Sequence, residues 1–523
     1  MAGAVTTTRR GLIGGAAATG AMLLAPRALA QAAAPVTAPA GRFQGIVGAG
    51  VRVFRGIRYG IAERFRAPQP LPPATEIVAA DRFGPPCPQN GSRYGLQSED
   101  CLFLNIWTAD AHPAARKPVM LYIHGGGYSA GSSTDPLCHG QHLAARGDVV
   151  VVSVNHRLNA LGYLYLARFD PRFADSGNAG QLDLMLALQW VKANIAAFGG
   201  DPARVMVFGQ SGGGAKIATL MGMPAAKGLF HRAATMSGQQ VTASGPLHAT
   251  ERARAFLARL GVSGRSLDDL DGLHVGKLMD ALEATDPYLG GGVYMGPVLD
   301  MKWLTRHPFW PDANPQGNAI PMMLGNTHDE TRAFVPPDSP RVQGLSWDNL
   351  AERMAPELRI DALPEWVVAE YRAKFPAWSP TEVFYAATTA GRSWRGQVIE
   401  AEARAAAGVP AWVYQVDFTS RTDPRRGAFH TMDIPLVFGT LGAEGSQTGT
   451  GADARAASQA MQERFVAFAK TGDPNRKGLA AWPRYTLPRR PTMVFDVASG
   501  LEDDPRQWQR ELFARIPYIQ PGT

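Results

Sequence analysis

The chain has 523 residues, of which 45% are hydrophobic, 19% charged and 9% aromatic, a composition that excludes collagen, coiled coils and extended disorder. Its 57 glycines and 40 prolines favour many turns over a bundle of long helices. The formal net charge is +7, and it falls to +4 without residues 1–30, which hold three arginines and no acidic residue. So small an excess, without a basic block interleaved with aromatic residues, argues against a nucleic-acid partner and favours small molecules.

The first thirty residues have the features of an export signal. Arg9 and Arg10 precede a small and apolar stretch, and residues 28–30 (ALA) fit the small-x-small pattern of a cleavage site. The paired arginines resemble a twin-arginine leader, with a Sec leader or a tethered segment as the alternative. The apolar stretch is shorter than the roughly 20 residues that a bilayer-spanning helix needs. We therefore predict a cleaved leader over 1–30, a linker over 31–40, export to the periplasm or the medium, and no stable membrane span.

Three cysteines follow the leader. Cys87 and Cys101 bracket 13 residues of a predicted loop, and an oxidising compartment would let them form a disulfide. Cys138 is then left without a partner. Three free buried thiols are the alternative, because spacing alone does not establish a bridge.

Short apolar runs rich in β-forming residues then alternate with helical patterns. The predicted strands lie at 119–123, 149–154, 205–208, 233–236, 321–324 and 412–416. Residues 181–198 and 453–470 carry apolar side chains at near-helical spacing. This alternation predicts the α/β class, with a mostly parallel central sheet flanked by helices. We expect one domain over 41–523, with largely helical cap insertions around 240–410.

The segment 204–214 (RVMVFGQSGGG) predicts a nucleophile. A predicted strand runs into Gly209-Gln-Ser211-Gly-Gly213 and then into a helical pattern over 215–221, which is the context that a nucleophile elbow requires. The glycines permit a tight turn that projects the Ser211 hydroxyl beside a helix N-terminus, where negative charge is favoured. A glycine-rich packing turn that happens to contain serine is the alternative.

A second glycine run lies upstream and predicts the donors that stabilise negative charge during the reaction. Attack of a serine on an ester carbonyl creates an oxyanion, which donors already aimed at it stabilise. The run His124-Gly-Gly-Gly-Tyr128 follows a predicted strand and allows the main chain to direct successive N–H groups into a site. By itself the run is also compatible with a flexible turn. Beside the elbow it predicts an oxyanion hole formed by the N–H groups of Gly126, Gly127 and Gly212.

The serine needs a base, and chain order narrows the choice. In α/β-hydrolase sheets the order along the chain is serine, acid, histidine. Of the six histidines after Ser211, only His430 lies beyond residue 330, in a loop that leads into apolar sequence. We predict His430 as the base and structural roles for the others. His139 and His142, beside Cys138, have no third ligand at a helpful spacing, so we predict no metal.

The acid must follow a strand between the serine and the histidine, so that it can hold the imidazole in the right tautomer. The predicted strand at 321–324 leads into a loop with two adjacent carboxylates, Asp329 and Glu330. The residues alone favour Glu330 only slightly and leave Asp329 as its rival.

These motifs, together with residues 98–107 (SEDCLFLNIW), 155–157 (NHR) and 438–439 (FG), resemble the type B carboxylesterase family, which includes cholinesterases and bacterial para-nitrobenzyl esterases. The resemblance covers nearly all of 41–523 and implies an α/β-hydrolase fold. It implies that Glu330 is the triad acid and that Ser237 is a supporting serine near it. It also matches Gly126, Gly127 and Gly212 to the oxyanion hole and Cys87 with Cys101 to the first disulfide of the family.

Two departures from the family stand out. Gln210 precedes the nucleophile where the family often has Glu. We expect Gln210 to lie beside the catalytic residues. The loop between Cys87 and Cys101 contains only Tyr94 as an aromatic residue, which argues against a choline ester as substrate. We expect pocket walls from 287–297, Phe334 and Phe429.

The sequence therefore predicts a carboxylic ester hydrolase that acts on small-molecule esters through an acyl-serine intermediate, with no cofactor. A serine amidase or peptidase with the same triad is one alternative. A non-catalytic binding module of the same fold is the other.

Overall fold

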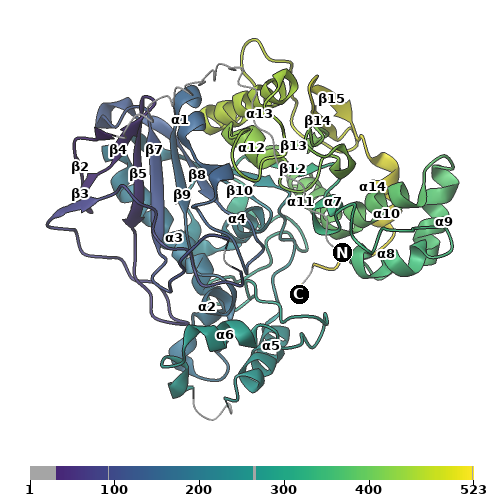
Figure 1. The fold of residues 1–523 in the computed structure, drawn as a ribbon, viewed down its shortest axis with the longest axis horizontal. Coiled ribbons are helices and arrows are strands. Elements are labelled where there is room, and N and C mark those ends of the chain that lie inside the picture. The colour runs from purple at the N-terminus through teal and green to yellow at the C-terminus, as the bar shows by residue number, and fades with distance from the viewer. Residues whose placement is uncertain (1–30, 92, 263–266, 521, 523) are drawn as a thin grey trace, which may run out of the picture.

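The computed structural model describes residues 31–91, 93–262, 267–520 and 522, and its centre is a twelve-stranded sheet (Figure 1). The predicted leader over 1–30 lies outside the described residues. In spatial order the strands are β1 (Gln31–Ala32), β4 (Ile46–Gly48), β5 (Val51–Arg58), β7 (Phe103–Thr108), β9 (Val150–Val154), β8 (Lys117–Ile123), β10 (Gly200–Gln210), β11 (Arg232–Met236), β12 (Met322–Thr327), β13 (Ala411–Val416), β14 (Pro491–Phe495) and β15 (Gly500–Asp503).

The middle of this sheet is parallel and its margins are antiparallel. Every neighbouring pair from β9 to β14 is parallel, and all six predicted strands lie in this part. The marginal strands β1, β4, β5, β7 and β15 pair antiparallel. Parallel strands buried on both faces read as continuous apolar runs, whereas the marginal strands mix polar and apolar residues. This difference explains why the sequence predicted only the central ones.

The predicted linker over 31–40 is wrong, because this segment contains two strands. β1 pairs with β4, and β2 (Val36–Ala38) joins β3 (Gly41–Gln44) and β6 (Ile77–Ala79) in a small second sheet. The segment is rich in alanine and proline, which have little intrinsic strand preference. Pairing with later segments, which local sequence cannot report, makes it extended.

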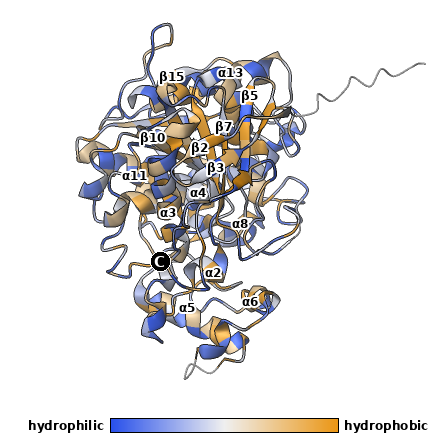
Figure 2. Ribbon diagram, turned by 90° about the vertical axis from the view of Figure 1, so that its left-hand side faces the viewer, coloured by the Kyte–Doolittle hydropathy of each residue, from blue (hydrophilic) through white to orange (hydrophobic). Residues whose placement is uncertain are grey.

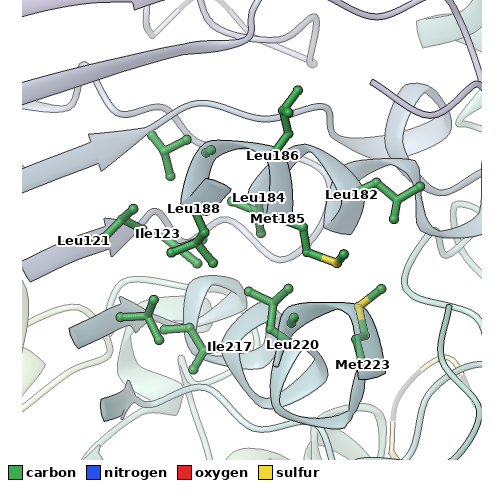
Figure 3. Packing of buried hydrophobic residues seen from close by; sticks show 14 of the residues in the cluster. Leu121, Ile123, Leu182, Leu184, Met185, Leu186, Leu188, Ile217, Leu220 and Met223 are labelled. Carbon is green, nitrogen blue, oxygen red and sulfur yellow. The ribbon is translucent and has the colours of Figure 1, made fainter. Parts of the chain in front are cut away.

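Side chains alternate between two cores along each central strand. On β8, Val119, Leu121 and Ile123 face one core, and Met120 and Tyr122 face the other. The first core lies against α3 (Ala179–Asn194) and α4 (Gly212–Gly222). Figure 3 shows buried side chains of these two helices packed close to one another, near Leu121 and Ile123 of β8. The second lies against α12 (Asp433–Phe438) and α13 (Ala452–Thr471). Figure 2 shows the apolar residues concentrated on the strands.

The helical insertions expected around 240–410 precede and follow β12 in the sequence, and β12 itself belongs to the sheet. The first contains α5 (Pro246–Arg259) and α6 (Val275–Ala281), at the lower end of the molecule in Figure 1. The second contains α7 (Thr331–Phe334), α8 (Leu350–Leu358), α9 (Pro364–Lys374), α10 (Pro380–Thr389) and α11 (Arg395–Ala406).

The second insertion has an apolar core of its own, which it shares with the C-terminal helix α14. The remaining α-helices of the described residues are α1 (Gln141–Gly147), α2 (Asn159–Tyr163) and α14 (Gln507–Ala514). Within the described part of the chain, no helix combines the length and the apolar character that crossing a bilayer requires.

Candidate active site

Ser211 occupies a sharp turn between β10 and α4. Its backbone has φ 55° and ψ −126°, a strained conformation for a residue with a side chain, and its N–H donates to the Met236 carbonyl of the next strand at 2.7 Å. The turn is crowded, because a Cβ at Gly213 would lie 2.0 Å from the Ile123 carbonyl oxygen. The segment therefore has the geometry of the predicted nucleophile elbow.

The glycine loop after β8 lies directly against this elbow. Gly126 and Gly127 have φ angles of +89° and +62°, which glycine adopts most easily. A Cβ at Gly212 would lie 2.0 Å from the Gly127 carbonyl oxygen, so the two loops are in contact. In the described structure the N–H groups of these three glycines donate to no protein acceptor, and all three residues line a cavity with Ser211. The predicted oxyanion-hole residues are therefore brought together.

His430 and Glu330 form a buried pair. His430 Nδ1 is hydrogen-bonded to Glu330 Oε2, with 5% of the histidine and none of the glutamate exposed. Glu330 lies between β12 and α7, and its Oε1 also accepts from the Thr327 N–H at 2.8 Å. The Ser237 hydroxyl, which accepts from the Thr327 N–H at 3.3 Å, also contributes to lowering the pKa of this carboxylate. Burial alone raises the pKa of Glu330, but His430 and these hydrogen bonds outweigh it, so that the pKa lies below its usual value.

Asp329, the rival acid, is hydrogen-bonded to Ala428 instead. Its Oδ2 accepts from the Ala428 N–H at 3.0 Å, and its own N–H donates to the Ala428 carbonyl at 2.9 Å. Burial alone raises the pKa of Asp329, but His328, Arg332 and the Ala428 N–H lower it well below its usual value. Asp329 therefore connects the loop of Glu330 to the loop of His430, and of these two acids it is Glu330 that is hydrogen-bonded to the imidazole in the described structure.

Ser211 and His430 line the same two cavities but are not hydrogen-bonded to each other in the described structure. The side-chain amide of Gln210, which is 1% exposed, lies 3.1 Å from His430 Nε2 instead. Gln210, which the sequence analysis placed beside the site, thus contacts the predicted base directly. Hydrogen bonds of an unliganded site commonly tighten only when substrate is bound.

Lys216 is a residue of the site that the sequence analysis missed. Its side chain is fully buried in α4, and its Nζ donates to the Gly127 carbonyl at 2.7 Å and lies 5.2 Å from the centre of the Tyr128 ring. Burial lowers the pKa of Lys216 to about 7. The available signal was a lone charged residue between Ala215 and Ile217, in a helix that is otherwise apolar.

Asp433 is a second missed residue. It is fully buried at the start of α12, and neither carboxylate oxygen has a hydrogen-bond partner among the described residues. Burial and the charge of Glu330 raise the pKa of Asp433 to about 7. A third carboxyl group therefore lies close to the His430–Glu330 pair, and its protonation is favoured.

The structure contains Cys87, Cys101 and Cys138 as buried free thiols, and the predicted disulfide is not formed in it. Cys87 and Cys101 are nevertheless neighbours. Hydrogen bonding to Cys87, together with burial, raises the pKa of the Cys101 thiol well above its usual value. Their pairing stays a prediction.

Two cavities meet at Ser211. The larger, of about 1020 Å³, is lined by residues 289–295, and the smaller, of about 550 Å³, by Phe429. Both are lined by Phe334, whose ring lies 5.0 Å from that of His430. A serine in a strained elbow thus opens onto space on two sides, enough for the two halves of an ester.

The comparisons with known proteins agree with this geometry. A model described as "Carboxylesterase family" matches residues 32–507. The chain belongs to the carboxylesterase family. It is 34% identical over 504 residues to the para-nitrobenzyl esterase of Bacillus subtilis (strain 168), which covers 91% of this chain and 97% of that relative. It is 32% identical over 499 residues to the fumonisin B1 esterase of Sphingopyxis macrogoltabida, covering 88% and 86%.

Solved structures give the same result. A carboxylesterase of Geobacillus stearothermophilus superposes with a TM-score of 0.81 at 34% identity, covering 91% of this chain and 99% of that one. A para-nitrobenzyl esterase superposes with a TM-score of 0.77 at the same identity and coverage. The chain therefore has the α/β-hydrolase fold, and it is a serine carboxylesterase that hydrolyses carboxylic esters.

Proposed function

We propose that Ser211, His430 and Glu330 are the catalytic triad of this esterase. The observation that carries the proposal is the pairing of His430 Nδ1 with the buried Glu330, beside a cavity onto which the strained Ser211 also opens. Glu330 holds the proton on Nδ1, which leaves the lone pair of Nε2 to accept the proton of the serine. Displacement of the Gln210 amide from Nε2 accompanies this contact.

The reaction then proceeds in two halves. Ser211 Oγ attacks the ester carbonyl as His430 takes its proton, and the alcohol leaves with that proton. The acyl group stays on Ser211 until a water molecule, deprotonated by His430, attacks it and releases the acid. Glu330 stabilises the imidazolium that forms in each half.

We propose that the N–H groups of Gly126, Gly127 and Gly212 hold the oxyanion in both halves. Their freedom from other acceptors in the described structure supports this role, because a donor already aimed at the reacting oxygen needs no reorganisation. The positive end of α4, which begins at Gly212, adds to the stabilisation.

A panel of p-nitrophenyl esters from acetate to palmitate, with the matching anilides, tests this assignment. Wild type should release p-nitrophenol and leave the anilides nearly intact, Ser211→Ala should be inactive, and His430→Ala should lose about three or more orders of magnitude in rate. An organophosphate should label Ser211 in the wild type. Ester hydrolysis that survives in Ser211→Ala, or labelling at another residue, would contradict the proposed nucleophile.

We also propose that residues 1–30 direct export, with cleavage after Ala30, and that Cys87 and Cys101 form a disulfide in the oxidising compartment. The Arg9-Arg10 pair and the contact between the two buried thiols support these proposals. Mass spectrometry of protein from the periplasm should find an N-terminus at Gln31 and a disulfide-linked peptide pair. A cytoplasmic protein with three free thiols would contradict both.

A further inference from the structure

The larger cavity at Ser211 has an unbalanced charge. Arg359 and Arg392 line it, and no aspartate or glutamate is among its described lining residues. The smaller cavity differs, because it is lined by Arg93 and Arg426 but also by Asp135, which pairs with Arg93 at 2.8 Å. The larger cavity therefore offers cations to whatever enters it, with no acidic side chain to neutralise them.

Arg392 is held close to the catalytic histidine. It belongs to a π-helical turn, Ala390–Trp394, inserted between α10 and α11, and such insertions occur frequently at functional sites. Its guanidinium carbon lies 3.9 Å from the centre of the Phe334 ring. Phe334 in turn lies 5.0 Å from the His430 ring, so a single aromatic side chain separates the guanidinium from the imidazole.

The protein neutralises Arg392 only in part. Its Nη1 donates to Glu357 Oε2 at 3.1 Å, but Arg341 is paired with the same carboxylate. Arg359 makes no ion pair with any described residue and is exposed at the end of α8. Burial and the charge of Arg359 lower the pKa of Arg392 to about 10, which shows how poorly this guanidinium is solvated.

A neighbouring hydroxyl also lacks a partner. Ser393, in the same π-helical turn, is 8% exposed and lines the cavity, and its Oγ makes no hydrogen bond within the described structure. A buried hydroxyl without a partner is unfavourable, and rotation of the Ser393 side chain toward an acceptor in the cavity would relieve it. An anion beside Arg392 would thus receive a guanidinium donor and, once the Ser393 side chain turns toward it, a hydroxyl donor as well.

We propose that this cavity is a carboxylate-binding subsite, formed by Arg392 and Ser393 with Arg359 at its rim, and that the preferred substrates are esters carrying a carboxylate. A planar guanidinium binds a carboxylate through paired hydrogen bonds, which suits a substrate anchored at one end and cleaved at the other. The inference rests on the proposed function, because the cavity opens onto Ser211. The inferred substrate class is half-esters of dicarboxylic acids, or hydroxy acids that are acylated on the hydroxyl and keep a free carboxylate.

Matched pairs of substrates that differ only in charge test the proposal. Monoethyl adipate against ethyl adipamate places the carboxylate in the acyl half, and 4-acetoxybenzoate against 4-acetoxybenzamide places it in the alcohol half. Wild type should prefer the charged member of at least one pair by about tenfold or more in kcat/KM, since a hydrogen bond to a charged group is worth that much. The preference should shrink as NaCl is added, because salt screens the exposed Arg359.

Variants then assign the preference to its residues. Arg392→Gln should reduce the ratio of charged to neutral kcat/KM to near one, and Arg359→Gln, on the exposed rim, should reduce it severalfold. Ser393→Ala should reduce it less. Arg341→Gln is the matched control: it also removes a partner of Glu357 but does not line the cavity, so the ratio should be kept.

Two results would overturn the subsite. One is the absence of a charge preference in both pairs, and the other is a preference that survives both Arg392→Gln and Arg359→Gln. The neutral esters separate this failure from a failure of the proposed function. If wild type hydrolyses them and Ser211→Ala does not, the triad stands whether or not the carboxylate matters.

Discussion

The two sides of Ser211 contain different ionisable groups. Behind the glycine loop lie the buried Lys216 and the stacked rings of His124 and His156, and no carboxylate among the described residues pairs with the lysine. Behind His430 lie the buried carboxyl groups of Glu330 and Asp433. Negative charge develops on the first side during the reaction and positive charge on the second. Protonated Lys216 on the first side and the Glu330 carboxylate on the second therefore supply the charges that stabilise the transition state.

The two sides also differ in what holds them in place. The glycine loop and α4 follow neighbouring parallel strands, β8 and β10, and pack directly on each other. Glu330 and His430 are 100 residues apart, and the two hydrogen bonds between Asp329 and Ala428 join their loops. The carboxylate side thus depends on a few specific contacts, and substitutions there should separate catalysis from stability most clearly.

The largest effect is expected from substituting the two adjacent acids, Glu330 and Asp329, one at a time. Glu330→Gln should lower kcat by about three to four orders of magnitude, because an amide cannot hold the imidazole tautomer or stabilise the imidazolium. Asp329→Asn keeps an acceptor for the Ala428 N–H and should lower kcat less than tenfold. Steady-state kinetics on p-nitrophenyl butyrate compares the two variants. Equal losses would contradict the assignment of Glu330 as the acid.

A second prediction uses pH to distinguish the carboxyl groups. The pKa of Asp433 is raised to about 7, so its contribution to stability is complete below the pKa of the unfolded chain, near 3.8, and is lost as the pH rises toward 7. Asp433→Asn keeps a neutral side chain. The free energy of unfolding of Asp433→Asn should therefore increase relative to that of wild type as the pH rises from 4 to 7, by an amount on the order of 4 kcal/mol at most.

Thermal unfolding of both proteins from pH 4.5 to 8 measures this effect as a widening difference in Tm. Asp329→Asn is the control with the opposite sign. The pKa of Asp329 is lowered, so its contribution is present at neutral pH and is lost only in acid. Parallel Tm curves for Asp433→Asn and wild type would contradict the raised pKa of Asp433.

The same contrast explains what the sequence could predict. The elbow and the glycine loop are continuous segments whose glycines are required by local crowding. Their sequence motifs were therefore enough to predict their geometry. Asp329 and Glu330 are adjacent in sequence, and the choice between them depends on the distant Ala428, which no local pattern reports. The resemblance to a family supplied that choice. Arg392 and Ser393 depend on a π-helical turn that the sequence analysis did not predict.

Substitutions at Lys216 should have the smallest effect on activity, and they test most specifically whether the two sides of Ser211 differ in their catalytic roles. Lys216→Gln keeps a donor for the Gly127 carbonyl without the charge, and Lys216→Met removes both. At pH 6, Lys216→Gln should lower kcat about tenfold with little change in KM, because the charge acts on the oxyanion in the transition state. Lys216→Met should lower kcat further, since the glycine loop also loses its contact.

The pH dependence and the stability of these variants make the test sharper. As the pH rises through about 7, wild-type Lys216 loses its proton, so the difference in kcat between wild type and Lys216→Gln should close. Lys216→Met should also raise Tm while it lowers activity, because it removes a buried cation that no carboxylate of the described structure neutralises. A variant that is less stable and equally impaired at pH 6 and 9 would show that Lys216 only supports the fold, and the charge asymmetry around Ser211 would then have no catalytic meaning.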